Sequence, residues 1–102
     1  MDVRVLKLMS GEELVGEVIA TDMISKNVTM KYPLVCLPTQ DGQMVFMPFC
    51  GTADTDSVVI RNTSLICDPL PAQEEIAIQY ERMVTPKEQP SNIYVPSGKI
   101  IS

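Results

Sequence analysis

Two pairs of neighbouring carboxylates are the residues whose types and spacing could support chemistry: Asp54 with Asp56, and Glu74 with Glu75. Such pairs can act as general acid and base or as oxygen ligands of Mg²⁺ or Ca²⁺. Their spacings match no known metal loop, and acidic residues are common in turns and at helix starts. The chain has no histidine, which removes imidazole catalysis and nearly all common zinc sites. We therefore expect no enzyme, no catalytic residue, no metal and no cofactor.

A second group of polar residues lies in two loops. Asp22 and Asn27 follow the apolar run Leu14–Ala20, and Arg61 follows the run Val58–Ile60. In a small, strongly curved antiparallel sheet, the loops near 22–27 and 61–63 could meet on one rim. Asp and Asn are also frequent turn formers, and Arg61 could be a solvated strand end, so both interpretations stay open.

Length and charge restrict the class of protein. The chain has 102 residues, which predicts one domain, and its net charge of −5 provides no overall positive field for duplex DNA or an anionic membrane. No apolar stretch approaches the roughly 20 residues of a membrane span, and no signal-peptide pattern opens the chain. We expect a cytoplasmic protein. The three cysteines, Cys36, Cys50 and Cys67, lie in apolar settings without a CxxC pair and are predicted to be reduced and buried.

Short β-branched or alternating runs predict a mainly β fold. Glycine in the middle of a strand, as at Gly16, usually indicates a sharp bend or a close backbone approach. Pro33 and Pro38 place their strand at an edge, at a bulge, or at an end near Leu37. Asp41–Gly42 predicts a two-residue hairpin turn. The predicted strands are Val3–Met9, Leu14–Ala20, Asn27–Tyr32, Met44–Phe49 with both faces buried, and the short runs Ser57–Ile60 and Leu65–Cys67 on either side of a turn.

The remaining third of the chain differs in character. Between Ala72 and Val84 a helical and a strand period compete, and Pro71 at a first helical position, early glutamates and Arg82 near the end favour a helix. Its apolar face is predicted to hold Ile76, Tyr80, Met83 and Val84. We expect a barrel over 1–70, a helix packed on it over 71–84, and an extended tail over 85–102. The apolar segments 93–95 and 100–101 are expected to dock on the domain or on a neighbouring subunit.

Two segments of the chain resemble the motifs of a known family. Val5–Leu8, Gly11–Gly16, Asp22 and Asn27–Met30 resemble the first Sm motif of Sm-like (LSm) proteins, and Val59–Ile66 resembles the second. The resemblance covers roughly residues 3–67. It implies a strongly bent, five-stranded antiparallel open barrel, closed homo-oligomeric rings formed by pairing of edge strands, and binding of single-stranded, often U-rich or A-rich, RNA.

Head-to-tail strand pairing would satisfy the backbone groups at the two edges of an open barrel. The run Met44–Phe49 and the strands at 57–60 and 65–67 are the natural candidates for that interface, with a role in the intramolecular core as the alternative. The predicted interface residues are Met44, Phe46, Val58, Ile60, Leu65 and Ile66.

The resemblance also implies an RNA pocket. Asn27 would read a base edge, Asp22 would orient its neighbours, Arg61 would cover the base face, and Lys26 would contact a phosphate. Asn62, which follows Arg61, would belong to the same RNA-binding set. In place of the usual stacking aromatic or histidine, the loop has Met, Ile and Ser at 23–25. The loop is also one residue longer than usual, Asn62 replaces a glycine, and the helix that usually precedes the barrel is missing. A lost stacking ring removes roughly 1–3 kcal/mol per base, so we expect weak RNA binding.

Two functions follow from the resemblance. The first is a ring-forming Sm-like protein that binds single-stranded RNA weakly, and the alternative is a ring that serves as a protein-interaction or assembly module without RNA binding. The segment Asn92–Pro96 and the closing apolar residues are similar to small Sm-like proteins of tailed phages. The resemblance therefore places the protein in the cytoplasm of a bacterial or phage-infected cell.

Overall fold

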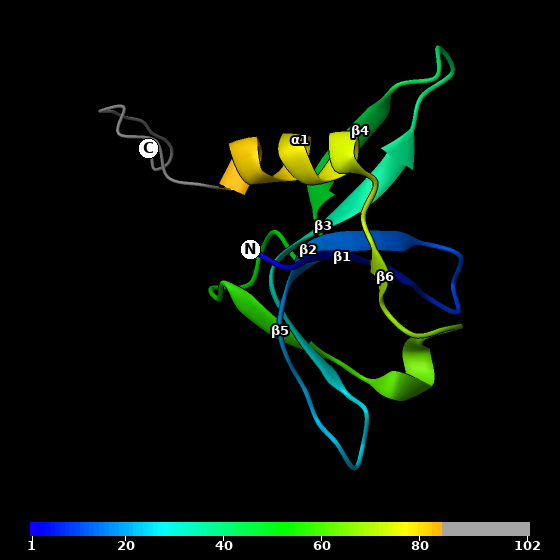
Figure 1. Cartoon of the computed structure of the whole chain (residues 1–102). Coiled ribbons are helices and arrows are strands. Elements are labelled where there is room, and N and C mark those ends of the chain that lie inside the picture. Colours follow the sequence, from blue (N-terminus) through cyan, green and yellow to red (C-terminus); the bar gives the residue numbers. More distant parts are fainter. Residues whose placement is uncertain (85–102) are drawn as a thin grey trace.

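The computed structural model describes residues 1–84, and the predictions for 85–102 lie outside the described residues. An antiparallel sheet of six strands carries one C-terminal helix (Figure 1), so the predicted mainly β class and the predicted helix are confirmed. The strand order is β4-β3-β2-β1-β6, and β5 pairs with β3. The elements are β1 Val3–Lys7, β2 Glu13–Thr21, β3 Val28–Pro38, β4 Met44–Pro48, β5 Ser57–Ile60, the 3₁₀ helix η1 Asn62–Ser64, β6 Leu70–Pro71 and α1 Glu74–Val84.

The end of the sheet differs from the prediction. The expected strand Leu65–Cys67 is wrong, because only Leu65 forms a bridge there, to Leu8. The Ile66 N–H donates to the Lys7 carbonyl at 3.0 Å, so the chain after β5 still returns to β1. The sixth strand is β6, which pairs with β1. Consequently Pro71 lies in this strand, and the prediction that it opens the helix is wrong.

Strand β3 changes its partner halfway along. Residues 28–31 pair with β5, whereas residues 34–38 pair with β4 on the same side. Between the two halves, Tyr32 has a φ of 49°, and β2 shifts register against β3 at this level. Pro33 is tolerated because it lies in the gap between the two ladders, where no hydrogen-bond donor is needed. Of the three places predicted for these prolines, the edge is wrong, since β3 has partners on both sides. The other two are confirmed, because the register shift lies beside Pro33 and the strand ends at Pro38, next to Leu37.

Gly16 lies opposite this kink. A Cβ at position 16 would collide with the Cγ and Sδ atoms of Met30 and lie 3.2 Å from the Lys31 carbonyl oxygen. Both expectations for a glycine within a strand, a bend and a close approach, are confirmed here.

The β3–β4 hairpin is present, but its loop is longer than predicted. The Thr39 N–H donates to the Gln43 carbonyl at 2.8 Å, and the Gly42 N–H donates to the Thr39 carbonyl at 3.1 Å. Gly42 has a φ of 85°, whereas Asp41 has no positive φ. This is the three-residue loop in which a turn is followed by one left-handed residue, so the predicted two-residue turn is wrong.

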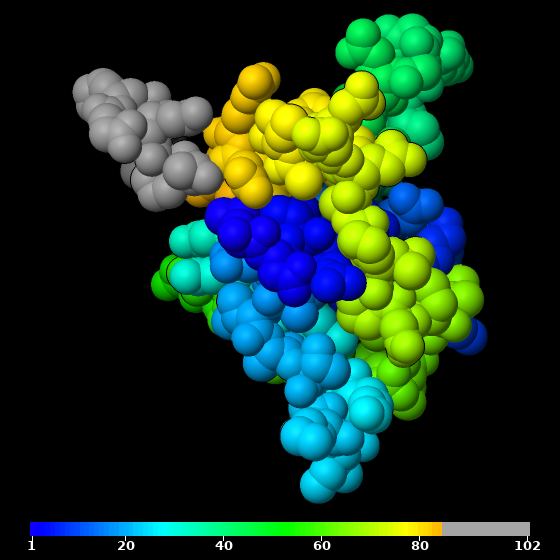
Figure 2. Space-filling view, in the orientation of Figure 1, coloured from blue at the N-terminus to red at the C-terminus, as the bar shows by residue number. Residues whose placement is uncertain are grey.

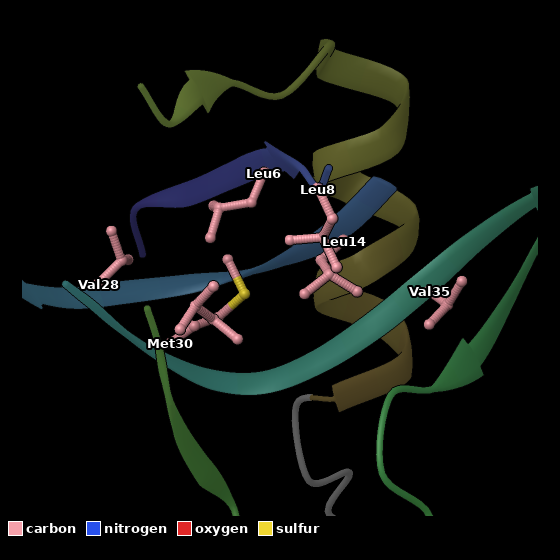
Figure 3. Packing of buried hydrophobic residues seen from close by; sticks show 7 residues of the cluster. Leu6, Leu8, Leu14, Val28, Met30 and Val35 are labelled. Carbon is pink, nitrogen blue, oxygen red and sulfur yellow. The ribbon is translucent and has the colours of Figure 1, made fainter. Parts of the chain in front are cut away.

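Two apolar clusters lie on opposite faces of the sheet. Neighbouring residues alternate between them, as Leu14 and Val15 do in β2, because successive side chains of a strand point to opposite faces. In Figure 3, Leu6, Leu14 and Met30 point toward one another inside the bent sheet. The second cluster lies under α1. The buried members are Leu6, Leu8, Leu14, Val28, Met30, Val35 and Ile60 in the first cluster, and Val3, Val15, Cys36, Phe46 and Tyr80 in the second.

Helix α1 packs on the second cluster through Ile76, Ala77, Tyr80 and Val84. Met83 is 55% exposed, so its predicted place on the buried face is wrong. No helix within residues 1–84 is long and apolar enough to cross a membrane.

All three cysteines are free, but their burial differs. Cys36 is buried under α1, and burial raises the pKa of its thiol to about 11. Cys50 and Cys67 are exposed, so the prediction that they are buried is wrong. Cys50 lies two residues after the end of β4, and Cys67 lies two residues after the bridge at Leu65. Both are in irregular segments, where no neighbouring strand within residues 1–84 covers them.

Candidate functional site

The two polar loops meet at one contact. The side-chain oxygen Oδ1 of Asn27 accepts a hydrogen bond from the backbone N–H of Asn62 at 2.8 Å. Asn27 begins the return from the β2–β3 loop, and Asn62 is the first residue of η1. The expectation that the loops near 22–27 and 61–63 share one rim is therefore confirmed. The Asn27 side-chain oxygen is thus used as an acceptor, and the amide N–H groups of the same side chain donate to no residue within 1–84.

Asp22 closes the β2–β3 loop on itself. Its carboxylate accepts a hydrogen bond from the Ser25 N–H at 2.7 Å, and its own N–H donates to the Asn27 carbonyl at 2.9 Å. Hydrogen bonds from the Ser25 side chain and backbone, with a smaller effect of the Lys26 charge, lower the pKa of the Asp22 carboxyl. Lys26 takes a φ of 64° to complete the turn. Asp22 thus acts as a turn former that holds the loop.

Two cations of the predicted RNA pocket are exposed at this rim. Neither Lys26 nor Arg61 forms an ion pair with another residue of 1–84. Lys26 and Asn62 line one groove, which also contains Arg4, Asp2 and Asp68. Arg4 is paired with Asp2 at 2.9 Å. The groove therefore contains both positive and negative side chains. Of its two cations, Arg4 is paired with Asp2, whereas Lys26 forms no ion pair with another described residue.

The other side of the β2–β3 loop is apolar. Met23 is 85% exposed and Ile24 is 93% exposed, at the tip of a hairpin that projects from the body of the molecule (Figure 2). They line a groove together with Ala20, Thr29 and Val59, and with Asp22 and Asn27 of the predicted RNA pocket. None of the described residues that line this groove is aromatic, so none of them could stack on a base.

The predicted interface residues belong largely to the core. Phe46 and Ile60 are buried, and Val58 and Leu65 pack partly buried against the first cluster. Met44 is partly buried against the second cluster, whereas Ile66 is 57% exposed. Within β4, Phe46 is buried because its face of the strand lies under α1. The other face is exposed at Val45 and Met47, so the predicted burial of both faces of Met44–Phe49 is wrong.

Exposed apolar residues on the same strands were not predicted from the sequence. On the face of the β3–β4 hairpin turned away from α1, Leu37 pairs with Val45, and Met47 pairs with Val35, which is itself buried in the first cluster. Leu37, Val45 and Met47 are 40%, 44% and 50% exposed, and Val59 of β5 is 54% exposed. The alternation around Phe46 was the available signal, but it does not reveal which face of the strand is covered.

The two carboxylate pairs lie on different exposed segments. Within residues 1–84, no group of three or more Asp, Glu, Cys or His side chains lies close enough to hold a metal ion. Asp54 and Asp56 lie in the exposed loop before β5, and the backbone carbonyl of Asp56 accepts a hydrogen bond from the Tyr32 N–H at 2.7 Å. Glu74 and Glu75 are exposed in the first turn of α1, where negative charge favours the helix dipole.

Comparison with known proteins adds no family: no protein-family model matches the chain, and no curated protein matches it either. The structure defines the class of a mainly β protein whose antiparallel sheet carries a C-terminal helix, with two polar loops joined by Asn27 and Asn62.

Proposed function

We propose that this protein is an Sm-like subunit that assembles with copies of itself into a closed ring. The observation that carries the proposal is that β4 and β5, which pair with the two halves of β3, each have an unpaired edge within residues 1–84. Strands β4 and β5 each pair with β3 on one side, and no strand within residues 1–84 pairs with their other side. Unpaired backbone donors and acceptors on an edge strand favour pairing with a strand of another chain.

Three further features support an Sm-like barrel. The kink of β3 at Tyr32 bends the sheet, and Gly16 allows Met30 to approach at the same level. The bridge between Leu8 and Leu65 brings the chain after β5 back to β1. These contacts join strands distant in the sequence around the first apolar cluster, as a small bent barrel requires.

Exposed apolar side chains accompany both edges. Leu37, Val45 and Met47 are neighbours on the face of the β3–β4 hairpin turned away from α1, beside the β4 edge, and Val59 lies on β5. A β4 strand of one copy paired with a β5 strand of the next would cover these side chains as well as the edge hydrogen-bonding groups. Because β4 and β5 are different strands, such a contact is head-to-tail, and it closes into a ring when the rotation between copies permits.

Charged substitutions at the edges test this contact. Val45→Lys places a charge beside the β4 edge, and Ile78→Lys is its matched control, because both side chains are 44% exposed and Ile78 lies on α1. Light scattering at one protein concentration should give a smaller mass for Val45→Lys and an unchanged mass for Ile78→Lys. Equal masses for the two variants would contradict pairing through β4.

At the rim, we propose weak binding of single-stranded RNA by Arg61, Lys26 and the free amide of Asn27. The two cations would contact phosphate or the face of a base. Fluorescence polarisation with U-rich and A-rich oligomers at low salt measures this binding. Arg61→Ala should weaken it and Arg82→Ala on α1 should not, and added salt should weaken it for the wild type.

A second candidate is an assembly module without RNA binding. The exposed Met23 and Ile24 at the loop tip favour it, because apolar residues there suit contact with a protein better than contact with a phosphate backbone. Absence of any polarisation change up to high micromolar protein, with the oligomer intact, would select this second function.

A further inference from the structure

A groove at the C-terminal end of α1 is lined by uncharged side chains. It has a volume of about 400 Å³, and its walls come from β3, β4, the segment after β4, β5 and the last residues of α1. Figure 1 places the end of α1 and the β4–β5 connection on the same side of the sheet. The apolar part of the lining includes Pro33, Leu34, Phe49, Val58, Met83 and Val84.

The chain continues directly from this groove. Val84 is both a lining residue and the last described residue of α1. Residues 89–98, Gln-Pro-Ser-Asn-Ile-Tyr-Val-Pro-Ser-Gly, contain no charged side chain, whereas Lys87 and Glu88 precede them and Lys99 follows. Ile93–Val95 is the apolar part of this uncharged run. Eight residues lie between Val84 and Ile93, and the nine steps from one to the other span up to about 30 Å in an extended chain.

We propose that the groove is the docking site of the chain's own segment Ile93–Val95. Apolar side chains of the segment match a groove without charge, and their removal from water stabilises the contact. Attachment at Val84 gives the segment a high effective concentration at the groove, so it competes well against free ligands. This inference goes beyond the ring and does not depend on it.

Cys50 provides a direct reporter, because it lines the groove and its thiol is exposed when the groove is open. Cys67 is also exposed but does not line the groove, so it is an internal reference in the same molecule. Cys36 is buried. Alkylation by iodoacetamide, followed by peptide mass spectrometry, gives the rate at each cysteine in the full chain.

The test compares the wild type with two double variants of the full chain. Ile93→Asp with Val95→Asp should raise the Cys50 alkylation rate at least roughly tenfold, because burial of even one such apolar side chain corresponds to about that factor. Ser91→Asp with Ser97→Asp adds the same charge to the same segment and should leave the rate unchanged. The Cys67 rate should be equal in all three proteins.

Two results would overturn the proposal. Equal Cys50 rates in the wild type and in Ile93→Asp with Val95→Asp would mean that this segment does not cover the groove. A wild-type Cys50 rate that rises on dilution, in step with a falling mass by light scattering, would mean that another copy covers it. Neither result alters the separate test of β4 pairing, since Val45 does not line this groove.

Discussion

The hydroxyl of Tyr80 in α1 lies 2.8 Å from the backbone carbonyl oxygen of Lys31 and 3.0 Å from that of Tyr32. These carbonyls are at the kink where β3 leaves β5 and approaches β4. At this point the β2–β3 ladder shifts register, and the hydroxyl of the fully buried Tyr80 donates to the backbone at the kink. The helix therefore holds the two halves of β3 at the angle that separates the two free edges.

Tyr80→Phe should lower the free energy of unfolding by about 1–3 kcal/mol, because it leaves partly buried carbonyls without this donor. Urea denaturation followed by circular dichroism measures the change. Tyr32→Phe is the control, since the Tyr32 ring is exposed and its hydroxyl is 3.5 Å from Asp56. A loss for Tyr80→Phe no greater than for Tyr32→Phe would contradict this role.

Because the Tyr80 hydroxyl is buried, we predict that the free energy of unfolding falls at alkaline pH. Burial raises the pKa of Tyr80 to about 12 from 10.0. A raised pKa in the folded state means that this contribution is complete below pH 10 and is lost as the pH rises toward 12. Burial of Cys36, with a pKa of about 11, adds a similar loss that begins near pH 9. Denaturation at a series of pH values should show both losses in the wild type and only the Cys36 loss in Tyr80→Phe.

Gly16→Ala should destabilise the fold by about 1–3 kcal/mol, the usual cost of adding a methyl group to a filled site. The new Cβ would collide with Met30, which is fully buried in the first apolar cluster. Gly51→Ala is the matched control, because its Cβ would lie 3.6 Å from Pro48 at an ordinary contact distance. Thermal unfolding should separate the two variants, and equal midpoints would show that Met30 moves aside without cost.

The link between the two loops can be tested at one amide. Asn27→Ala removes the acceptor of the Asn62 N–H, so hydrogen exchange at Asn62 should accelerate, and stability should fall by about 0.5–1.5 kcal/mol. Asn27→Asp keeps an acceptor oxygen and should preserve most of the protection. Unchanged exchange at Asn62 in Asn27→Ala would contradict the role of this contact in joining the loops.

Much of the fold could be predicted from local patterns in the sequence. Gly16 within an apolar run indicated a bend, because glycine weakens the interior of a strand and is found there mainly at bends and close approaches. Asp41–Gly42 indicated a hairpin, because glycine readily takes the positive φ that such turns require. The helix ending at Val84 followed from its apolar spacing and charges. The meeting of the loops near 22–27 and 61–63 followed from the expected curvature of the sheet, whereas the particular contact between Asn27 and Asn62 is known only from the structure.

The remaining features depend on contacts between distant residues. Alternation in β4 indicates two faces, but only the position of α1 decides that Phe46 is buried and Val45 exposed. The donor role of Tyr80 depends on a kink 48 residues away in the sequence. The short β6 could not be predicted, since Pro71 discourages a strand and only pairing with β1 creates one.

The most direct test of the central claim is the mass of the wild-type protein in solution, measured by light scattering over a range of concentrations. A ring built by head-to-tail pairing of β4 with β5 predicts one stable species of three or more copies, with no larger species as the concentration rises. A monomer at all concentrations would contradict the account.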